Sequence, residues 1–149
     1  MIQHIDVHAV LQESVSSVYA DLVTRPTGRV VRERIECVMA AAEGDGAVAV
    51  ARIDFTGVGC IDYSCADEIV AKLLRGLSAV LVLTGLSDGH REAIEPVLAG
   101  HRLAALIERR DGTLEAVGPP DLAAALLDEL VERRLAARTA GGTFALTLA

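Results

Sequence analysis

Aromatic residues, cysteines and long uncharged segments are all scarce in this sequence. Phe, Trp and Tyr make up 3% of the chain and Trp is absent, which argues against a platform on which bases or sugars stack. The three cysteines, Cys37, Cys60 and Cys65, show no CxxC spacing, so we expect reduced thiols rather than a disulfide framework or a metal site. The longest run without Asp, Glu, Lys or Arg, residues 76–87, is shorter than the roughly 18–20 residues of a membrane-spanning helix.

Positive charge is in the minority as well. The chain has 14 Lys and Arg against 21 Asp and Glu, a formal net charge of −7, so its overall field repels nucleic acid and anionic membranes, and we expect neither as a partner. Neither a Walker pattern nor a GxGxxG pattern is present, and we expect no cofactor. Residues 1–6 have neither the positive region nor the apolar region of a secretory signal, which favours a cytoplasmic location.

Hydrophobic residues, 52% of the 149, supply the core of a single α/β domain. Apolar residues at three- and four-residue spacing predict helices over residues 8–23, 26–42, 65–77, 88–100 with an interruption at Pro96, and 119–138. Apolar runs predict buried strands over 47–55 and 79–84, joined by a right-handed helical crossover. Short strands are expected over 103–108 and 113–117, around an Asp111-Gly112 turn, and the tail, 143–149, alternates like an edge strand. The pattern predicts a small mixed sheet with helices mainly on one face.

The most distinctive segment, residues 52–70, follows the first of these strands and reads RIDFTGVGCIDYSCADEIV. A buried strand ends there, a short loop follows, and Asp62 and Ser64 lie where a helix begins. This pattern resembles the STAS domain of sulfate transporters and anti-sigma-factor antagonists, in which an Asp-Ser-Ser-Gly or related loop opens the helix after the central strand. The resemblance extends over about residues 27–117. The string from Ser64 to Glu68 is most similar to STAS-like domains of unassigned function, which often have Ser-Phe-Ala-Asp-Glu there.

The resemblance implies a STAS-like domain over residues 25–149, preceded by an N-terminal helical extension over residues 1–24. It also implies a regulatory interaction module of the anti-sigma-factor-antagonist type rather than an enzyme. In such antagonists a serine at the position of Ser64 is phosphorylated by a serine kinase that is also the anti-sigma factor, and the modification abolishes binding. The residues expected to contact the partner are Asp62, Tyr63, Ser64, Cys65, Asp67 and Glu68.

The same loop allows simpler interpretations. Asp62 or Ser64 could serve only as a helix N-cap, which contributes about 1 kcal/mol. Cys65, near a helix start, could be a nucleophile, although the surrounding carboxylates disfavour its thiolate. Ser87 matches the letters of a nucleophile elbow, Gly-x-Ser-x-Gly, but no histidine follows His101 to complete a triad. A small enzyme that uses Cys65 or Ser87 is therefore one alternative function.

Two further features concern the first third of the chain. Thr24, Arg25, Thr27 and Arg29 open the second predicted helix and could contact an anion or an acidic partner. A solvated helix face with a local Arg32–Glu36 pair is the other interpretation. The apolar stripe from Val10 to Leu22 has no obvious place in a STAS-like core, which predicts a homo-oligomer. A purely structural oligomer subunit is the second alternative function.

Overall fold

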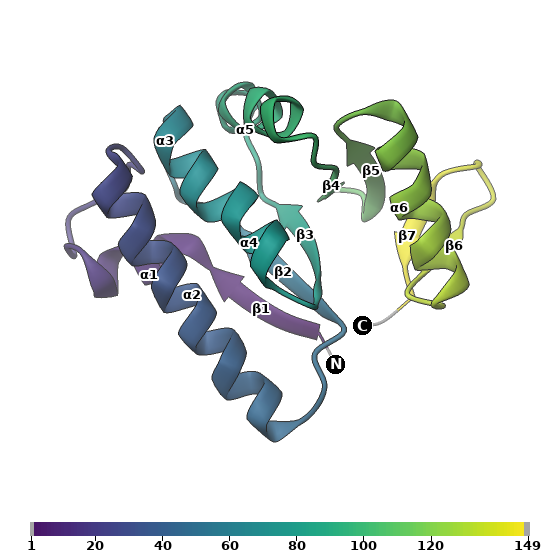
Figure 1. The fold of residues 1–149 in the computed structure, drawn as a ribbon, viewed down its shortest axis with the longest axis horizontal. Coiled ribbons are helices and arrows are strands. Elements are labelled where there is room, and N and C mark those ends of the chain that lie inside the picture. The colour runs from purple at the N-terminus through teal and green to yellow at the C-terminus, as the bar shows by residue number, and fades with distance from the viewer. Residues whose placement is uncertain (1, 148–149) are drawn as a thin grey trace.

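The computed structural model describes residues 2–147 and has a mixed α/β fold around one seven-stranded sheet (Figure 1). The strand order is β1-β2-β3-β4-β5-β7-β6. The strands are β1 (Ile2–Asp6), β2 (Val50–Asp54), β3 (Val80–Thr84), β4 (Ala105–Glu108), β5 (Thr113–Val117), β6 (Ala136–Arg138) and β7 (Phe144–Leu146). The helical elements are α1 (Val7–Ser14), α2 (Arg25–Asp45), α3 (Tyr63–Ala66), the π-helical turn η1 (Asp67–Ala71), α4 (Lys72–Gly76), α5 (Asp88–His101) and α6 (Pro120–Glu132).

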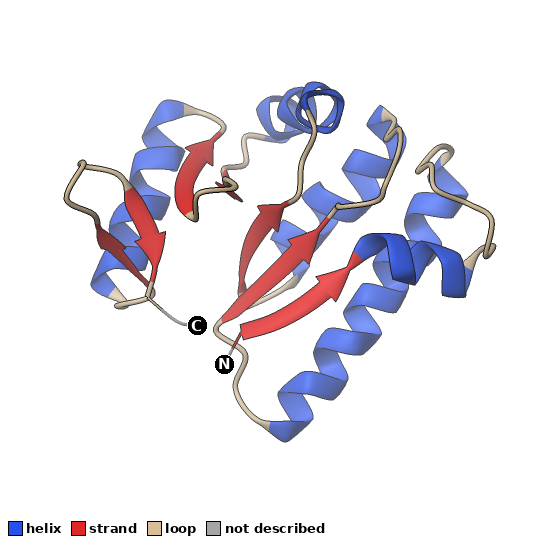
Figure 2. Ribbon diagram, turned by 180° about the vertical axis from the view of Figure 1, so that it is seen from behind, coloured by secondary structure: helices blue, strands red, loops and turns tan. Residues whose placement is uncertain are grey.

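The sheet is mixed, as the sequence predicts. Strands β1 to β4 are parallel, and β4 and β5 form an antiparallel hairpin at the predicted turn. The parallel pair β2–β3 is connected through α3, η1 and α4, which run without a break, so the predicted strand–helix–strand unit is confirmed. The sheet curls strongly from β1 to β6 (Figure 2).

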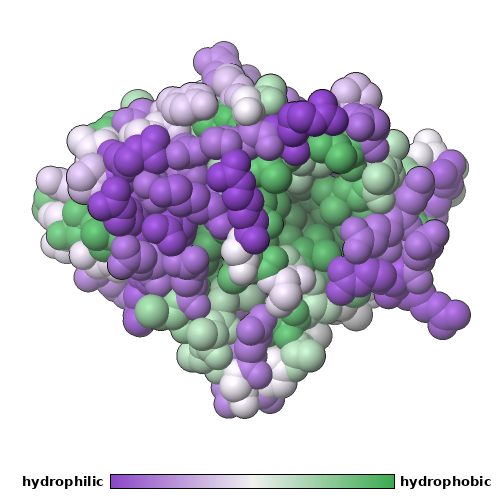
Figure 3. Space-filling view, in the orientation of Figure 1, coloured by the Kyte–Doolittle hydropathy of each residue, from purple (hydrophilic) through white to green (hydrophobic). Residues whose placement is uncertain are grey.

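Helices cover both faces of the sheet unequally. Alternate strand residues Ala51, Ile53, Leu81 and Leu83 point into the main core with apolar residues of α1, α2, η1 and α5. Their neighbours Val50, Val82, Leu106 and Leu114 point the other way, into a smaller core with Leu130 of α6. The helices therefore lie mainly on one face, as expected, and α6 covers part of the other. On the side shown in Figure 3, the surface over α2 and α4 is largely hydrophilic, and a hydrophobic hollow lies between α4 and α6.

The N-terminal prediction of one helix over residues 8–23 is wrong. Residues 2–6 form β1, which pairs with β2, and helix α1 ends at Ser14. Residues 15–24 then form a loop that has one isolated bridge, between Leu22 and Ile61. Of the stripe that suggested an oligomer, Val10, Leu11 and Leu22 are buried in the chain's own core. Only the part from Val15 to Tyr19 remains exposed.

Two C-terminal predictions also need correction. The last helix ends at Glu132 rather than near Arg138, because Arg134 adopts a left-handed conformation and residues 136–138 form β6. Strand β7 is not an edge strand, since it pairs with β5 on one side and β6 on the other. Residues 148 and 149 of the predicted tail lie outside the described residues.

The predicted interruption of a helix at Pro96 is also wrong, because Pro96 lies within α5 and the helix continues through it.

Within residues 2–147, we find no helix with the length and apolar character required to cross a bilayer.

Candidate functional site

Asp62 organises the start of α3 and joins it to the loop before α2. Its Oδ1 accepts hydrogen bonds from the Cys65 amide and the Ser64 hydroxyl, both at 2.8 Å, and its Oδ2 accepts one from the Thr24 amide at 3.0 Å. Burial raises the pKa of Asp62, but these hydrogen bonds outweigh it and hold the pKa below its usual value. Asp62 is thus the N-cap, and Ser64 is bound to that cap.

Glu68 lies on η1 and is the centre of a buried ion-pair cluster between that turn and α2. Its side chain is 0% exposed, and its carboxylate accepts bonds from Lys72 at 2.8 Å, Arg25 at 3.0 Å and Arg32 at 3.2 Å. Burial raises the pKa of Glu68, yet the three cations together keep it below the usual range. A carboxylate with so many charged donors is satisfied despite its burial.

Asp67, the neighbour of Glu68, extends this cluster to α5. Arg25 donates to its carboxylate at 2.7 Å, and His101 Nε2 donates at 2.6 Å while His101 Nδ1 accepts from Arg75. Burial opposes ionisation of Asp67, but Arg25 and His101 lower its pKa overall. Arg25 is bound to both adjacent carboxylates, and their charge raises its own pKa. The cluster ties α2, η1 and α5 together.

Cys65 is enclosed where α2 crosses α3. Its thiol donates to the Thr24 carbonyl at 3.0 Å, and its side chain is 0% exposed. Gly28 allows this close approach, because a Cβ on Gly28 would lie 2.9 Å from the Cys65 Cα. Burial and the Asp62 charge raise the thiol pKa to about 12. Cys65 is therefore a buried thiol at neutral pH, which leaves it without the reactivity of a nucleophile.

The structure divides the predicted partner contacts into exposed and buried residues. Tyr63 is 53% exposed, and Asp62 and Ser64 are half-buried. Cys65, Asp67 and Glu68 are buried, so their side chains support the loop from within and present no surface to a partner. Among the predicted anion contacts, Arg25 is engaged by the chain's own carboxylates, whereas Arg29 is exposed and makes no ion pair within residues 2–147.

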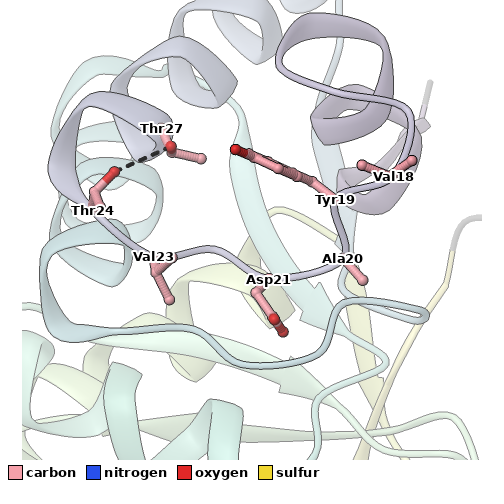
Figure 4. A pocket seen from close by; sticks show the side chains of 7 residues that line it. All are labelled: Val18, Tyr19, Ala20, Asp21, Val23, Thr24 and Thr27. Atoms are coloured by element: carbon pink, nitrogen blue, oxygen red, sulfur yellow. Dashed lines mark hydrogen bonds between the residues drawn. The ribbon is translucent and has the colours of Figure 1, made fainter.

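The loop before α2 carries exposed apolar side chains that the sequence interpretation assigned to a helix. Val18 is 82% exposed, Tyr19 47% and Val23 46%. Together with Ala20, Asp21, Thr24 and Thr27 they line a pocket of about 300 Å³ at the start of α2 (Figure 4). Tyr19 extends across this pocket toward Thr27, whose hydroxyl accepts from that of Thr24 at 3.2 Å. Thr24 and Thr27 thus lie together beside an apolar surface, and their predicted contact with an anion or an acidic partner stays a prediction.

Ser87 is the N-cap of α5. Its hydroxyl accepts from the His90 amide at 3.2 Å, and its own amide donates to His90 Nδ1 at 3.0 Å. His90 Nε2 donates to the Gly59 carbonyl at 2.7 Å. Both nitrogens of this buried imidazole are engaged with backbone groups, so His90 does not activate the Ser87 hydroxyl. The arrangement is a capping box, without the serine–histidine contact of a hydrolase.

The loop after β2 contacts His90 of α5, as described above, and also the loop of residues 15–24. Gly59 donates to the Ala20 carbonyl at 2.7 Å, Cys60 donates to Asp21 at 2.7 Å, and Leu22 donates to the Cys60 carbonyl at 2.8 Å. Nothing in the local sequence signals these contacts, because the partners are almost forty residues apart.

Comparison of the chain with protein families, with curated proteins and with solved structures gives no match.

Proposed function

We propose that this protein is a regulatory protein–protein interaction module of the STAS-like, anti-sigma-factor-antagonist type, with Ser64 as a phosphoacceptor. The partner would bind an exposed surface formed by Val18, Tyr19, Val23 and Tyr63, which we call the docking surface. The observation that carries the proposal is the Asp62 carboxylate, which binds the Ser64 hydroxyl and the Thr24 amide at the same time. One side chain thereby connects a modifiable hydroxyl to the loop that presents the exposed apolar residues.

The docking surface has the composition of a recognition site. Two tyrosines and two valines are exposed within or next to one short loop, and tyrosine is enriched at interface centres because it combines a large apolar ring with a hydrogen-bonding group. We include Tyr63 at the margin of this surface, because it directly follows Asp62, whose amide donates to the Leu22 carbonyl at 3.0 Å, while its hydroxyl lies near Gly100 of α5. A protein partner with a small apolar patch fits this surface.

Phosphorylation of Ser64 would change this surface through Asp62. The modified side chain can no longer donate its proton to Asp62 Oδ1, and it places about two negative charges beside that carboxylate. Repulsion then acts on the same group that holds the Thr24 amide and the start of α3. We expect the loop of residues 15–24 to loosen, which lowers the affinity of the docking surface for its partner.

Hydrogen exchange tests the connection without knowledge of the partner. Ser64→Asp should speed amide exchange in residues 18–24, whereas Ser64→Ala, which adds no charge, should change it less. Ser78→Asp is the matched control, because Ser78 is exposed and lies before β3, at the opposite end of the sheet. Equal exchange in Ser64→Asp and Ser78→Asp would show that Ser64 does not control the loop.

Affinity capture from extracts of the source cell tests the docking surface and the modification together. Val18→Ser and Tyr63→Ser should lose a partner that wild-type protein and Val131→Ser both retain, since Val131 is also exposed but lies on α6. Mass spectrometry of the recovered protein should find phosphate on Ser64. An unmodified Ser64, together with equal partner binding by wild type and Ser64→Asp, would refute the phosphoswitch.

Localisation in the cytoplasm and self-association remain part of this proposal. The anti-sigma factor or serine kinase of the source cell is the partner class that the resemblance implies. A second copy of the chain is the competing occupant of the docking surface, and sedimentation of wild type against Val18→Ser distinguishes the two.

A further inference from the structure

A second candidate site lies at the carboxyl ends of three neighbouring parallel strands, away from Ser64. The loops after β2, β3 and β4 enclose a cavity of about 630 Å³, lined among others by Thr56, Gly85, Ser87 and Arg110. This volume lies within the range of small-molecule sites. In open parallel α/β sheets, ligands bind in the crevice outside the carboxyl ends of the strands.

The backbone around the cavity is held in place by the chain itself. Gly85 has φ 69°, and a Cβ there would clash with Asp54 Oδ1 and lie 2.8 Å from the Thr56 amide, so only glycine allows the two loops to meet. On the adjoining wall, His90 binds Ser87 at one nitrogen and the Gly59 carbonyl at the other. The cavity is thus preformed by fixed loops.

Arginines from two elements line the cavity in a chain that is acidic overall. Arg91 of α5 donates to both oxygens of Glu115, at 3.1 and 3.0 Å, and Arg109 donates to the same carboxylate at 3.3 Å. One carboxylate thus positions two guanidinium groups, and its charge raises the pKa of Arg91. Arg110 is exposed and makes no ion pair within the described part of the chain.

The acidic side chains of the lining are fewer and partly engaged. Glu108 pairs with Arg52 at 2.9 Å, which compensates its charge within the sheet. Asp88 is exposed in the first turn of α5. The Asp88 amide is the first of α5 after the Ser87 N-cap, and it has no acceptor within that helix. Guanidinium groups and a free helix-terminal amide are the donors that bind oxyanions.

We infer that this cavity binds a small molecule that carries a phosphate or a similar oxyanion, with Arg110 as its principal charged contact. Arg109 and the first turn of α5 complete the binding groups, and the loop glycines allow the ligand to approach the backbone. The inference is independent of the docking surface and of Ser64 phosphorylation.

Titration of ¹⁵N-labelled protein with inorganic phosphate, at constant ionic strength set with chloride, tests the site. We expect saturable shifts of the Asp88, Gly89 and Arg110 amides, and at least tenfold weaker binding by Arg110→Gln. Arg102→Gln is the matched control, since Arg102 is an exposed arginine at the other end of α5, paired with Asp121 at 3.4 Å. Its affinity should equal that of wild type. A parallel titration with acetate shows whether a carboxylate serves in place of phosphate.

Three results would overturn the inference: shifts no larger than those with chloride, shifts that map to other surfaces, or equal affinity of Arg110→Gln and wild type. Because Arg110 is exposed in a turn, its replacement leaves the core intact. Matching spectra of the unliganded variant and wild type away from the turn check this directly.

Discussion

Glu68→Gln probes the buried cluster with almost no change in shape. The substitution keeps the size of the side chain and removes the charge that Lys72, Arg25 and Arg32 surround. Breaking a buried ion pair costs about 3–5 kcal/mol. The three cations are 39%, 40% and 17% exposed, so water recovers part of that loss, and we expect the free energy of unfolding to fall by about 2–3 kcal/mol.

Urea denaturation followed by circular dichroism measures this loss. With a denaturant slope of about 2 kcal/mol/M, the midpoint should fall by about 1–1.5 M. Glu36→Gln is the control, because Glu36 also binds Arg32, at 2.7 Å, but is 38% exposed. An exposed i,i+4 pair of this kind contributes only about 0.3–0.5 kcal/mol.

The loss of unfolding free energy caused by Glu68→Gln should depend on pH in a defined direction. Because the folded pKa of Glu68 lies below its unfolded value, its ionisation stabilises the fold above the unfolded pKa of about 4.3. That stabilisation disappears as the pH falls through the folded pKa. The difference between wild type and Glu68→Gln should therefore be complete at pH 7 and narrow below about pH 4. If Glu68→Gln is no less stable than Glu36→Gln at pH 7, the cluster does not hold α2 to η1 as we argue.

Two further predictions concern the helix crossing and the thiols. Gly28→Ala should lower stability by about 1–3 kcal/mol through overpacking against Cys65. In contrast, Gly44→Ala, whose Cβ meets nothing within 4 Å, should be neutral or stabilising by up to about 1 kcal/mol in thermal unfolding; equal losses in both would contradict the close contact. Folded protein treated with iodoacetamide at pH 8 should gain adducts at the exposed Cys37 and Cys60 but not at the buried Cys65, because burial raises the Cys65 pKa to about 12. Rapid labelling of Cys65, read by peptide mass spectrometry, would instead revive the enzyme hypothesis.

The elements with strong local patterns could be predicted from the sequence. Val31 and Ile35 form the buried stripe of α2. Both faces of β3, and those of β2 except at Arg52 and Asp54, are apolar because the main core lies on one face and the second core on the other. Local charge spacing also predicted one contact that the structure confirms, Arg32–Glu36. Arg32 and Glu36 lie four residues apart on one helix, so the local sequence is enough to indicate their contact.

The failures arise where distant contacts override a local pattern. The helical spacing of α1 continues at Val15, Val18 and Tyr19. The helix nevertheless ends at Ser14, and Leu22 forms a β-bridge with Ile61. Strand β1 is only five residues long and depends on β2, nearly fifty residues away. The place of β7 between β5 and β6 likewise depends on pairing across the sheet.

The candidate site was predicted in part for the same reason. The local sequence predicts a helix start with Asp62 or Ser64 as its cap, and the structure shows that Asp62 is the cap. The link from Asp62 to Thr24 and the pairing of Arg25 with Asp67 and Glu68 join residues about forty positions apart. No periodicity or spacing rule connects such residues, so the sequence alone left Asp67 and Glu68 as surface contacts.

The π-helical turn η1 also determines where this part of the chain can change in length. A π turn accommodates one more residue than an α turn between the same end points. Deleting one residue from η1 would therefore restore α-helical spacing and leave the orientation of α4 relative to α3 unchanged. Leu73 would stay in the main core, and Asp62 and Ser64 would stay next to Thr24. The same deletion from the regular helix α2 would rotate the residues on its two sides by about 100° relative to each other, so η1 is the place where a change in length leaves the core and the site together.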